Sequence, residues 1–253
     1  MKFWLWIFPL FVHGLIIETE HIEEVLSHVD QSTVVFFDVD DTLFTSDVQL
    51  GKALRFLDEW NMLKSQGLND EQALVICREH WDAIQKRCLI RHLDPDIKSI
   101  LEWIQARALY TMALTARAPR TMDITHDQLK FLGLDFTACS PLTLEVELPI
   151  ENGYKDGIWF IERNEKGHSV RKWLDTLPVH PRKIILVDDT YRHVKNMEES
   201  LSDLGIEFVG IHYTKAHKHP YQADIAQKQA EFFPEILTDE QASELLRDCR
   251  RIN

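Results

Sequence analysis

The sequence VVFFDVDDTL, residues 34–43, decides how the rest of the chain is interpreted. Its first four residues are apolar, two of them β-branched and two aromatic, which is the pattern of a buried strand. The strand leads directly into three carboxylates, Asp38, Asp40 and Asp41. Such a cluster at the end of a core strand is costly unless a metal ion or a cationic side chain compensates its charge. Because ligands bind at the carboxyl ends of strands in open parallel sheets, we expect a cation and an anionic ligand here.

A calcium-binding loop is the main alternative for this stretch, because Asp38, Asp40 and Thr42 alternate as the ligands of an EF-hand do. An EF-hand also requires glycine at its sixth position and a bidentate glutamate at its twelfth. Leu43 and Gln49 occupy those two positions. The sequence therefore excludes an EF-hand.

The composition is that of a folded protein, with 45% hydrophobic and 27% charged residues in a chain of 253 residues. This length suits one large domain, or one domain with an insertion. The formal net charge of −13 argues against nucleic acid as a partner, since that would need a basic face. A phosphorylated small molecule remains a suitable substrate, because a bound metal ion reverses the charge locally.

The N-terminal segment has the pattern of a short secretory signal peptide. Lys2 precedes an apolar run over residues 3–12, and Gly14 offers a cleavage site. We therefore expect residues 1–14 to be removed from an exported protein, periplasmic or secreted, whose mature chain starts at Leu15. The run is shorter than the roughly 20 residues that span a bilayer, so no stable membrane span is expected. In the alternative, residues 3–17 pack on the core of a cytoplasmic protein.

Strand and helix patterns alternate along the chain, which predicts an α/β fold with a doubly wound parallel sheet. Two helical patterns within residues 47–91 have no strand between them and indicate a helical insertion. The predicted core then comprises residues 15–46 and 92–253. Its strands are expected at 34–37, 109–114, 157–161, 184–187 and 206–211, and its helices at 18–29, 94–106, 119–133, 222–233 and 238–250, with two more around Val170 and Val194.

Three of the predicted strands end in polar residues that could share one pocket if the strands are neighbours. The set comprises Asp38 with Asp40, Thr115, Asp188 with Asp189, and Lys166 at the start of a helix. Together these side chains supply what phosphoryl transfer to a carboxylate requires.

Each predicted catalytic residue has a distinct role. Asp38 attacks phosphorus and holds a covalent aspartyl-phosphate. Thr115 donates a hydrogen bond to the transferring oxygens. Lys166 offsets the negative charge and keeps Asp38 ionised. Asp40 protonates the leaving group and then activates water, for which its acidic neighbours must raise its pKa.

The same carboxylates predict a metal site. Mg²⁺ takes hard oxygen ligands in an octahedral shell and keeps several waters. We expect its ligands to be Asp38, the backbone carbonyl of Asp40, and Asp188 with its neighbour Asp189.

This set of motifs resembles the haloacid dehalogenase (HAD) superfamily of phosphohydrolases over about residues 30–215. The matching sequences are DVDDTL at 38–43, Leu114-Thr115, Lys166-Gly167 and Val187-Asp188-Asp189. Residues 211–213 and the helix at 222–233 also resemble an uncharacterised bacterial family of exported HAD proteins related to acid phosphatases.

The resemblance implies a Rossmann-like core, with a mobile helical cap formed by residues 47–91. Asp at position 40 is typical of the superfamily's phosphatases, whereas transport ATPases have Thr there and dehalogenases lack the acid. The resemblance therefore implies Mg²⁺-dependent phosphomonoester hydrolysis through an aspartyl-phosphate. The alternative function is an exported interaction protein that kept the fold and lost turnover.

Several residues can each be interpreted in two ways from the sequence. Lys155 is the alternative to Lys166, although it lies in a glycine-rich turn and not at a helix start. Arg117 either contacts a substrate phosphate or is an exposed loop cation. The histidines of the loop, His212, His217 and His219, either bind a metal or are simply polar residues.

Overall fold

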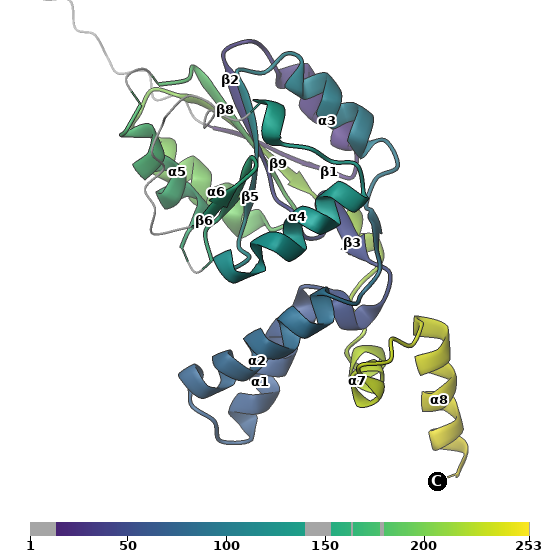
Figure 1. Cartoon of the computed structure of the whole chain (residues 1–253). Helices are drawn as coiled ribbons and strands as arrows, with labels where there is room; N and C mark the ends of the chain where they lie inside the picture. The colour runs from purple at the N-terminus through teal and green to yellow at the C-terminus, as the bar shows by residue number, and fades with distance from the viewer. Residues whose placement is uncertain (1–13, 140–152, 163, 178–179, 253) are drawn as a thin grey trace, which may run out of the picture.

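The computed structural model describes residues 14–139, 153–162, 164–177 and 180–252. Its main feature is a seven-stranded sheet with the strand order β1-β9-β8-β2-β5-β7-β6. Neighbouring strands are parallel except β6 and β7, which are antiparallel (Figure 1). The strands are β1 (Leu15–Thr19), β2 (Thr33–Phe37), β5 (Tyr110–Thr115), β6 (Gly153–Lys155), β7 (Ile158–Phe160), β8 (Lys183–Asp188) and β9 (Glu207–Tyr213).

Helices cover both faces of this sheet, and β2 lies between the two layers. Val35 and Phe37 of β2 pack into one core, against η1, α3 and α4, whereas Val34 and Phe36 pack into the other, against α5 and α6. The predicted α/β doubly wound fold is therefore confirmed. The helices are η1 (Ile22–His28), α3 (Ile97–Gln105), α4 (Met122–Phe131), α5 (Lys166–Leu174) and α6 (Tyr191–Leu201).

The segment predicted as a helix over residues 18–29 differs in the structure. Leu15–Thr19 form the edge strand β1, which pairs with β9, and only residues 22–28 are helical, as the 3₁₀ helix η1. Side chains of β1 are exposed or half-buried at the sheet edge, and its apolar run, residues 15–17, is shorter than the roughly four or more residues that indicate a buried strand. Its strand conformation depends on pairing with β9, which is distant in sequence.

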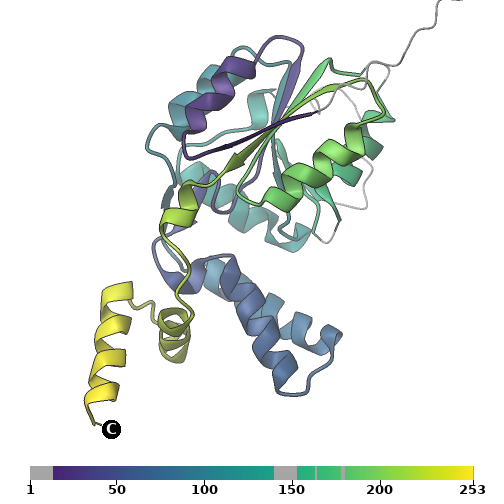
Figure 2. The ribbon, with the colours of Figure 1, turned by 180° about the vertical axis from the view of Figure 1, so that it is seen from behind.

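The helical insertion, defined as α1 (Leu54–Ser65) and α2 (Asp70–Gln85), projects from the sheet, as Figure 2 shows from behind. β3 (Phe44–Ser46) precedes the insertion in sequence and β4 (Ile90–His92) follows it. These two strands pair with each other as a separate antiparallel sheet. Asn69 caps α2 by accepting a hydrogen bond from the backbone N–H of Gln72, whose side chain binds the Asn69 N–H in return. This capping box stabilises the start of α2, the second of the two helices predicted within residues 47–91.

Of the last two helices, α7 (Ala223–Phe232) lies beside the helical insertion, and α8 (Asp239–Ile252) packs against α7 on the side away from it (Figure 1). Gln229 of α7 accepts a hydrogen bond from the Leu50 N–H at 2.8 Å, and Asp239 accepts one from the Gln49 N–H at 3.0 Å. The C-terminal helices thus hold the segment that leads into α1. The division into a core and an inserted domain remains a prediction.

The predicted signal peptide, residues 1–14, lies outside the described residues except for Gly14. Part of the irregular segment expected at 135–152 is also outside them, from residue 140 onward. Within the part of the chain that the structure describes, no helix has both the length and the apolarity to cross a membrane.

Candidate active site

The three predicted strand ends meet at one edge of the sheet. β2 lies between β5 and β8, and Phe37 pairs with Ala113 on one side and with Val187 on the other. This register places Asp38 level with Leu114 and Asp188, with Thr115 one residue further along β5, and the Asp38 N–H donates to the Val187 carbonyl at 2.9 Å. The expectation that these strands are neighbours is therefore correct.

Lys166 lies within this group of acids. It is the first residue of α5, and its side chain is 1% exposed. Its Nζ lies 2.5 Å from Asp38 Oδ1 and 2.5 Å from Asp188 Oδ2. Burial alone would lower the pKa of Lys166, but the two carboxylates outweigh burial and raise the pKa, so the ammonium keeps its charge.

Gly167 allows the first turn of α5 to lie close to α6. A side-chain Cβ at residue 167 would lie 2.5 Å from the backbone oxygen of Asn196 in α6. Because glycine has no such atom, α5 packs closely on α6 and places Lys166 at the site. Lys155, the alternative cation, instead lies on β6 and forms an ion pair with Asp123 at 2.6 Å.

Asp38, Asp188 and Asp189 form a cluster that could hold a metal ion, because one carboxylate oxygen of each lies within 4.8 Å of the others. When all three carboxylates are ionised, the one ammonium of Lys166 leaves two negative charges uncompensated, and a divalent cation would neutralise them. The donors are hard oxygens, which suit Mg²⁺ or Ca²⁺ better than softer metals. The residues present therefore fit such a cation.

The pKa values within this cluster differ. Burial, followed by the neighbouring carboxylates, raises the pKa of Asp189 to about 9. Burial also raises the pKa of Asp38 to about 7, although Lys166 opposes it. For Asp188, burial is outweighed by Lys166 and His193, so its pKa is lowered. The role of Lys166 in keeping Asp38 ionised remains a prediction.

Asp188 and Asp189 are also contacted by three residues to which the sequence analysis assigned no role in holding these acids. Thr42 Oγ1 accepts the Asp189 N–H at 3.1 Å, and His193 Nδ1 lies 3.2 Å from Asp188 Oδ1. His212 Nε2 donates to the Asp189 carbonyl at 3.1 Å. Thr42 lies within the DVDDTL motif, directly after Asp41, and this position is the signal that could have indicated its contact with the site.

The metal interpretation of the histidine loop finds no support among the described residues. Among all the described residues, the only group of three or more His, Cys, Asp or Glu side chains placed to share a metal ion is the aspartate cluster. His217 packs edge-on against His212, with ring centroids 5.8 Å apart. Both rings, with His219, line the cavity at the site.

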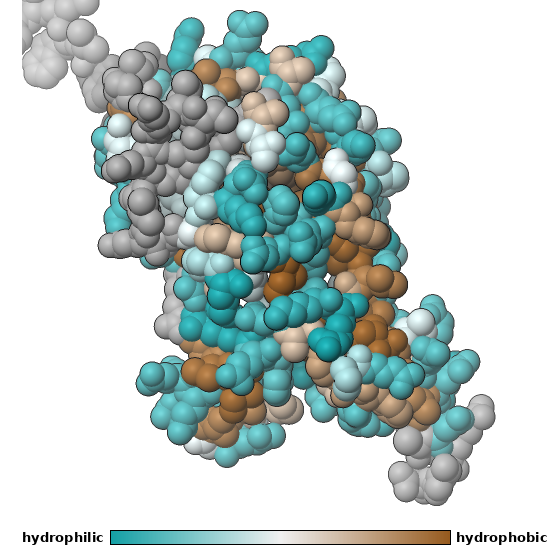
Figure 3. All heavy atoms as spheres, in the orientation of Figure 1, coloured by the Kyte–Doolittle hydropathy of each residue, from teal (hydrophilic) through white to brown (hydrophobic). Residues whose placement is uncertain are grey.

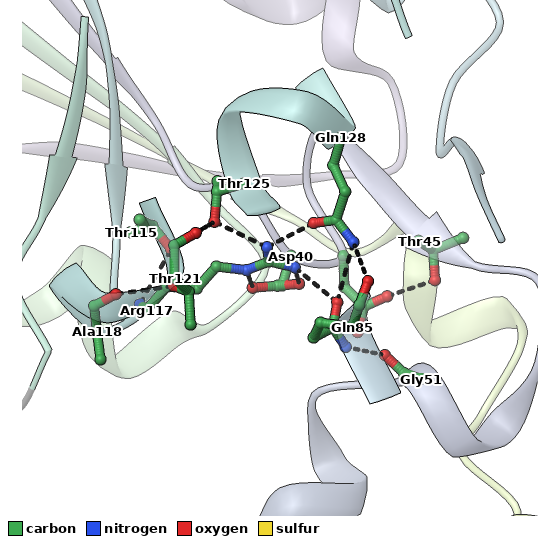
Figure 4. A network of polar contacts seen from close by, with 11 residues as sticks. Asp40, Thr45, Gly51, Gln85, Thr115, Arg117, Ala118, Thr121, Thr125 and Gln128 are labelled. Carbon is green, nitrogen blue, oxygen red and sulfur yellow. Dashed lines mark hydrogen bonds and ion pairs between the residues drawn. The ribbon is translucent and has the colours of Figure 1, made fainter. Parts of the chain in front are cut away.

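The side chain of Asp40 points toward Arg117 (Figure 4). Arg117 Nε and Nη2 donate to the two oxygens of Asp40 at 2.8 and 2.7 Å. The same guanidinium donates to Gln128 at 2.6 Å and to Gln85 at 3.0 Å. Arg117 is only 6% exposed, so its description as an exposed loop cation is wrong. It connects the end of β5 to α4 and to the last residue of α2.

Thr115 lines the cavity and is buried. Its Oγ1 accepts the Arg117 N–H at 3.1 Å. A hydroxyl that accepts one hydrogen bond can still donate its own proton. Asp41 lies in a turn, where its φ is 56° and its side chain accepts a hydrogen bond from the Thr45 hydroxyl at 2.6 Å.

The Arg117 network gives a first prediction, which concerns stability. Arg117→Lys should lower the free energy of unfolding by about 2–4 kcal/mol, because one ammonium cannot replace the fork that binds Asp40, Gln85 and Gln128. The matched control is Arg171→Lys, which alters an exposed pair with Asp203 and should change little. Denaturant unfolding of both variants tests this, and equal losses would show that the network adds no more than a surface pair.

The fold and site thus define an α/β protein with a buried acidic cluster at the carboxyl ends of adjacent parallel strands. Residues 18–243 match the model of the family described as "Protein of unknown function (DUF2608)", and the chain belongs to that family.

Two curated relatives are each named "Putative outer membrane protein". The one from Chlamydia trachomatis serovar D is 26% identical over 238 residues, and the one from Chlamydia muridarum is 27% identical over 237. Each alignment covers 92% of this chain and 90% of the relative. Among solved structures, a HAD family hydrolase from Salmonella enterica serovar Typhi matches with a TM-score of 0.38 and 15% identity, over 74% of this chain and 70% of that one.

Proposed function

We propose that the protein is a Mg²⁺-dependent phosphomonoester hydrolase that works through an aspartyl-phosphate on Asp38. The observation that carries this proposal is the placement of Lys166 between Asp38 and Asp188, with Asp189 in the same cluster. A single buried cation among three acids leaves negative charge for a metal to neutralise. The cavity at the site, lined by Asp38 and Thr115, gives a phosphate ester access to the proposed nucleophile.

In the first step, an oxygen of Asp38 forms a bond to phosphorus and the bond from phosphorus to the ester oxygen breaks. Asp40 gives its proton to that oxygen, and the alcohol leaves. In the second step, Asp40 takes a proton from water, whose oxygen displaces Asp38 from phosphorus and releases inorganic phosphate. Thr115 donates a hydrogen bond to the transferring oxygens. Mg²⁺ held by Asp38, Asp188 and Asp189 would offset negative charge on these oxygens.

Asp40 must leave its pair with Arg117 before it can act as an acid. In the structure both carboxylate oxygens of Asp40 accept hydrogen bonds from this guanidinium, so neither is directed at a substrate. The phosphate of an entering substrate is a competing acceptor for Arg117. Binding of substrate would thereby release Asp40, which takes up a proton from water and then gives it to the ester oxygen, and Arg117 acts by positioning Asp40.

Phosphate release from a panel of phosphomonoesters tests the proposal. We expect hydrolysis with Mg²⁺, loss of activity after removal of metal with EDTA, and recovery when Mg²⁺ is restored. Ca²⁺ should inhibit, because its looser coordination lets a carboxylate bind through both oxygens and so blocks attack. If no ester is hydrolysed by the folded, Mg²⁺-loaded protein, the catalytically silent alternative is favoured. Activity that survives EDTA would refute the metal assignment.

We also propose that the protein is exported. The pattern of Lys2, the apolar run at 3–12 and Gly14 supports this proposal, and both curated relatives carry the words "outer membrane" in their names. The first residue of protein recovered from its native host tests it. A start at Leu15 is expected, whereas a start at Met1 or Lys2 would contradict cleavage at Gly14.

A further inference from the structure

The cavity at the site extends well beyond the acidic cluster. Its volume is about 1020 Å³, at the upper end of the range for small-molecule sites. A phosphate group fills only a small part of such a space. The rest must accommodate the alcohol part of an ester, so the residues there bear on the class of substrate.

One wall of the cavity is apolar and comes from the helical insertion. Leu54, Phe56, Leu74 and Trp81 of α1 and α2 line it. The rings of Phe56 and Trp81 meet edge to face, with centroids 6.1 Å apart, which fixes their orientation. Leu54 is 54% exposed, so this wall includes apolar surface that a bound group could cover. In Figure 3, apolar side chains are visible over α1 and α2.

The basic side chains that line the cavity away from Asp40 are already engaged. Arg78 forms an ion pair with Glu162, and Arg120 binds Asp82 at 2.8 Å. Lys52 donates to the backbone carbonyl of His219 at 2.6 Å. Each of these three cations would have to give up its present partner before it could bind a second phosphate or a carboxylate of a substrate.

The charge of the lining points the same way. Its five acids exceed its four Lys and Arg residues. A second anionic group would therefore have to compete with acceptors of the protein that already bind each of these four cations. The acids are Asp38, Asp40, Asp41, Glu162 and Asp189, and the cations are Lys52, Arg78, Arg117 and Arg120.

We infer that this cavity selects monophosphate esters whose alcohol part is apolar and flat and carries no second charge. The inference rests on the phosphatase activity proposed above. Sugar phosphates would leave hydroxyl groups against the wall of Leu54, Phe56, Leu74 and Trp81 without hydrogen-bond partners, and bisphosphates would add uncompensated charge. The apolar wall covers an aromatic or similarly flat group and removes its surface from water.

Three esters of aliphatic alcohols test the inference, since their leaving groups have comparable intrinsic reactivity. We expect kcat/KM for benzyl phosphate to exceed that for glycerol 3-phosphate and for fructose 1,6-bisphosphate by roughly 10-fold or more. Leu54→Gln should lower the ratio of benzyl to glycerol phosphate kcat/KM by roughly 10-fold. Leu57→Gln is the matched control, because Leu57 lies on the same helix, is 52% exposed and is not among the lining residues.

Equal kcat/KM values for the three esters, or equal effects of Leu54→Gln and Leu57→Gln on the ratio, would overturn the inference. A second measurement does not depend on turnover: the affinities of benzylphosphonate and methylphosphonate for the Mg²⁺-loaded protein, by calorimetry. Tighter binding of benzylphosphonate, weakened in Leu54→Gln only, supports the inference, and equal binding refutes it. Hydrolysis of none of the esters would instead refute the proposed activity.

Discussion

Asp38→Asn is expected to reduce phosphoester hydrolysis by roughly 10⁴-fold or more while the protein stays folded. The amide has the shape of the carboxylate but cannot attack phosphorus. Lys166 keeps its contact with Asp188 at 2.5 Å, so the buried ammonium does not lose all of its charge partners. Phosphate release at high protein concentration, with circular dichroism as the test of folding, measures both parts of the expectation.

The control for this variant is Asp203→Asn, which makes the same chemical change at an exposed aspartate paired with Arg171. Asp203 is not among the residues that line the cavity. The control should retain full activity. Hydrolysis by Asp38→Asn at a rate near that of Asp203→Asn would rule out Asp38 as the nucleophile.

Lys166→Met is expected to remove activity and also to destabilise the protein. The methionine is close to lysine in size, but its uncharged side chain leaves Asp38 and Asp188 without their shared cation in a buried site. Breaking a buried ion pair from one side costs about 3–5 kcal/mol of unfolding free energy. Denaturant unfolding measures this cost in the metal-free protein, where no divalent ion compensates for the loss.

Lys155→Met is the matched control, since Lys155 is the other lysine that the sequence offers for this role. It pairs with Asp123 on the surface and does not line the cavity. Its variant should retain both stability and activity. If the two variants behave alike, the assignment of Lys166 as the site's compensating cation is wrong.

Much of the site could be predicted from sequence because its chemistry follows directly from strand ends. Residues 34–37 are apolar without interruption, so the strand and the acids after it could be located by pattern alone. Asp188 follows an equally apolar strand. Parallel strands have their carboxyl ends at one edge, which brought these acids together without knowledge of the exact register. Lys166 was found because it opens a helix before the last of those strands.

The role of Arg117 could not be predicted in the same way. Its hydrogen bond to Asp40 joins residues 77 positions apart in sequence. Its hydrogen bonds to Gln85 and Gln128 depend on how α2 and α4 are positioned in the fold. No local pattern specifies such long-range geometry. The edge strand β1 was missed for a similar reason, because its half-exposed residues form a strand only through pairing with β9.

The C-terminal helices show the same limit of local patterns. The amphipathic patterns at 222–233 and 238–250 predicted helices, and α7 and α8 occupy these segments. Their partners were not predictable, since Gln229 and Asp239 bind backbone groups of Leu50 and Gln49 from the other end of the chain. These contacts place the tail beside the helical insertion that forms the apolar wall of the cavity.

The central claim is a covalent phosphoryl group on Asp38, and the Asp40→Asn variant with 4-nitrophenyl phosphate and Mg²⁺ tests it most directly. Nitrophenolate leaves without a proton from residue 40, whereas attack by water needs the base that this variant lacks. The account predicts a rapid burst of one nitrophenolate per protein molecule before phosphate appears, with the phosphoryl group on Asp38 by mass spectrometry. Nitrophenolate and phosphate released in step from the first turnover, with Asp38 unmodified, would contradict it.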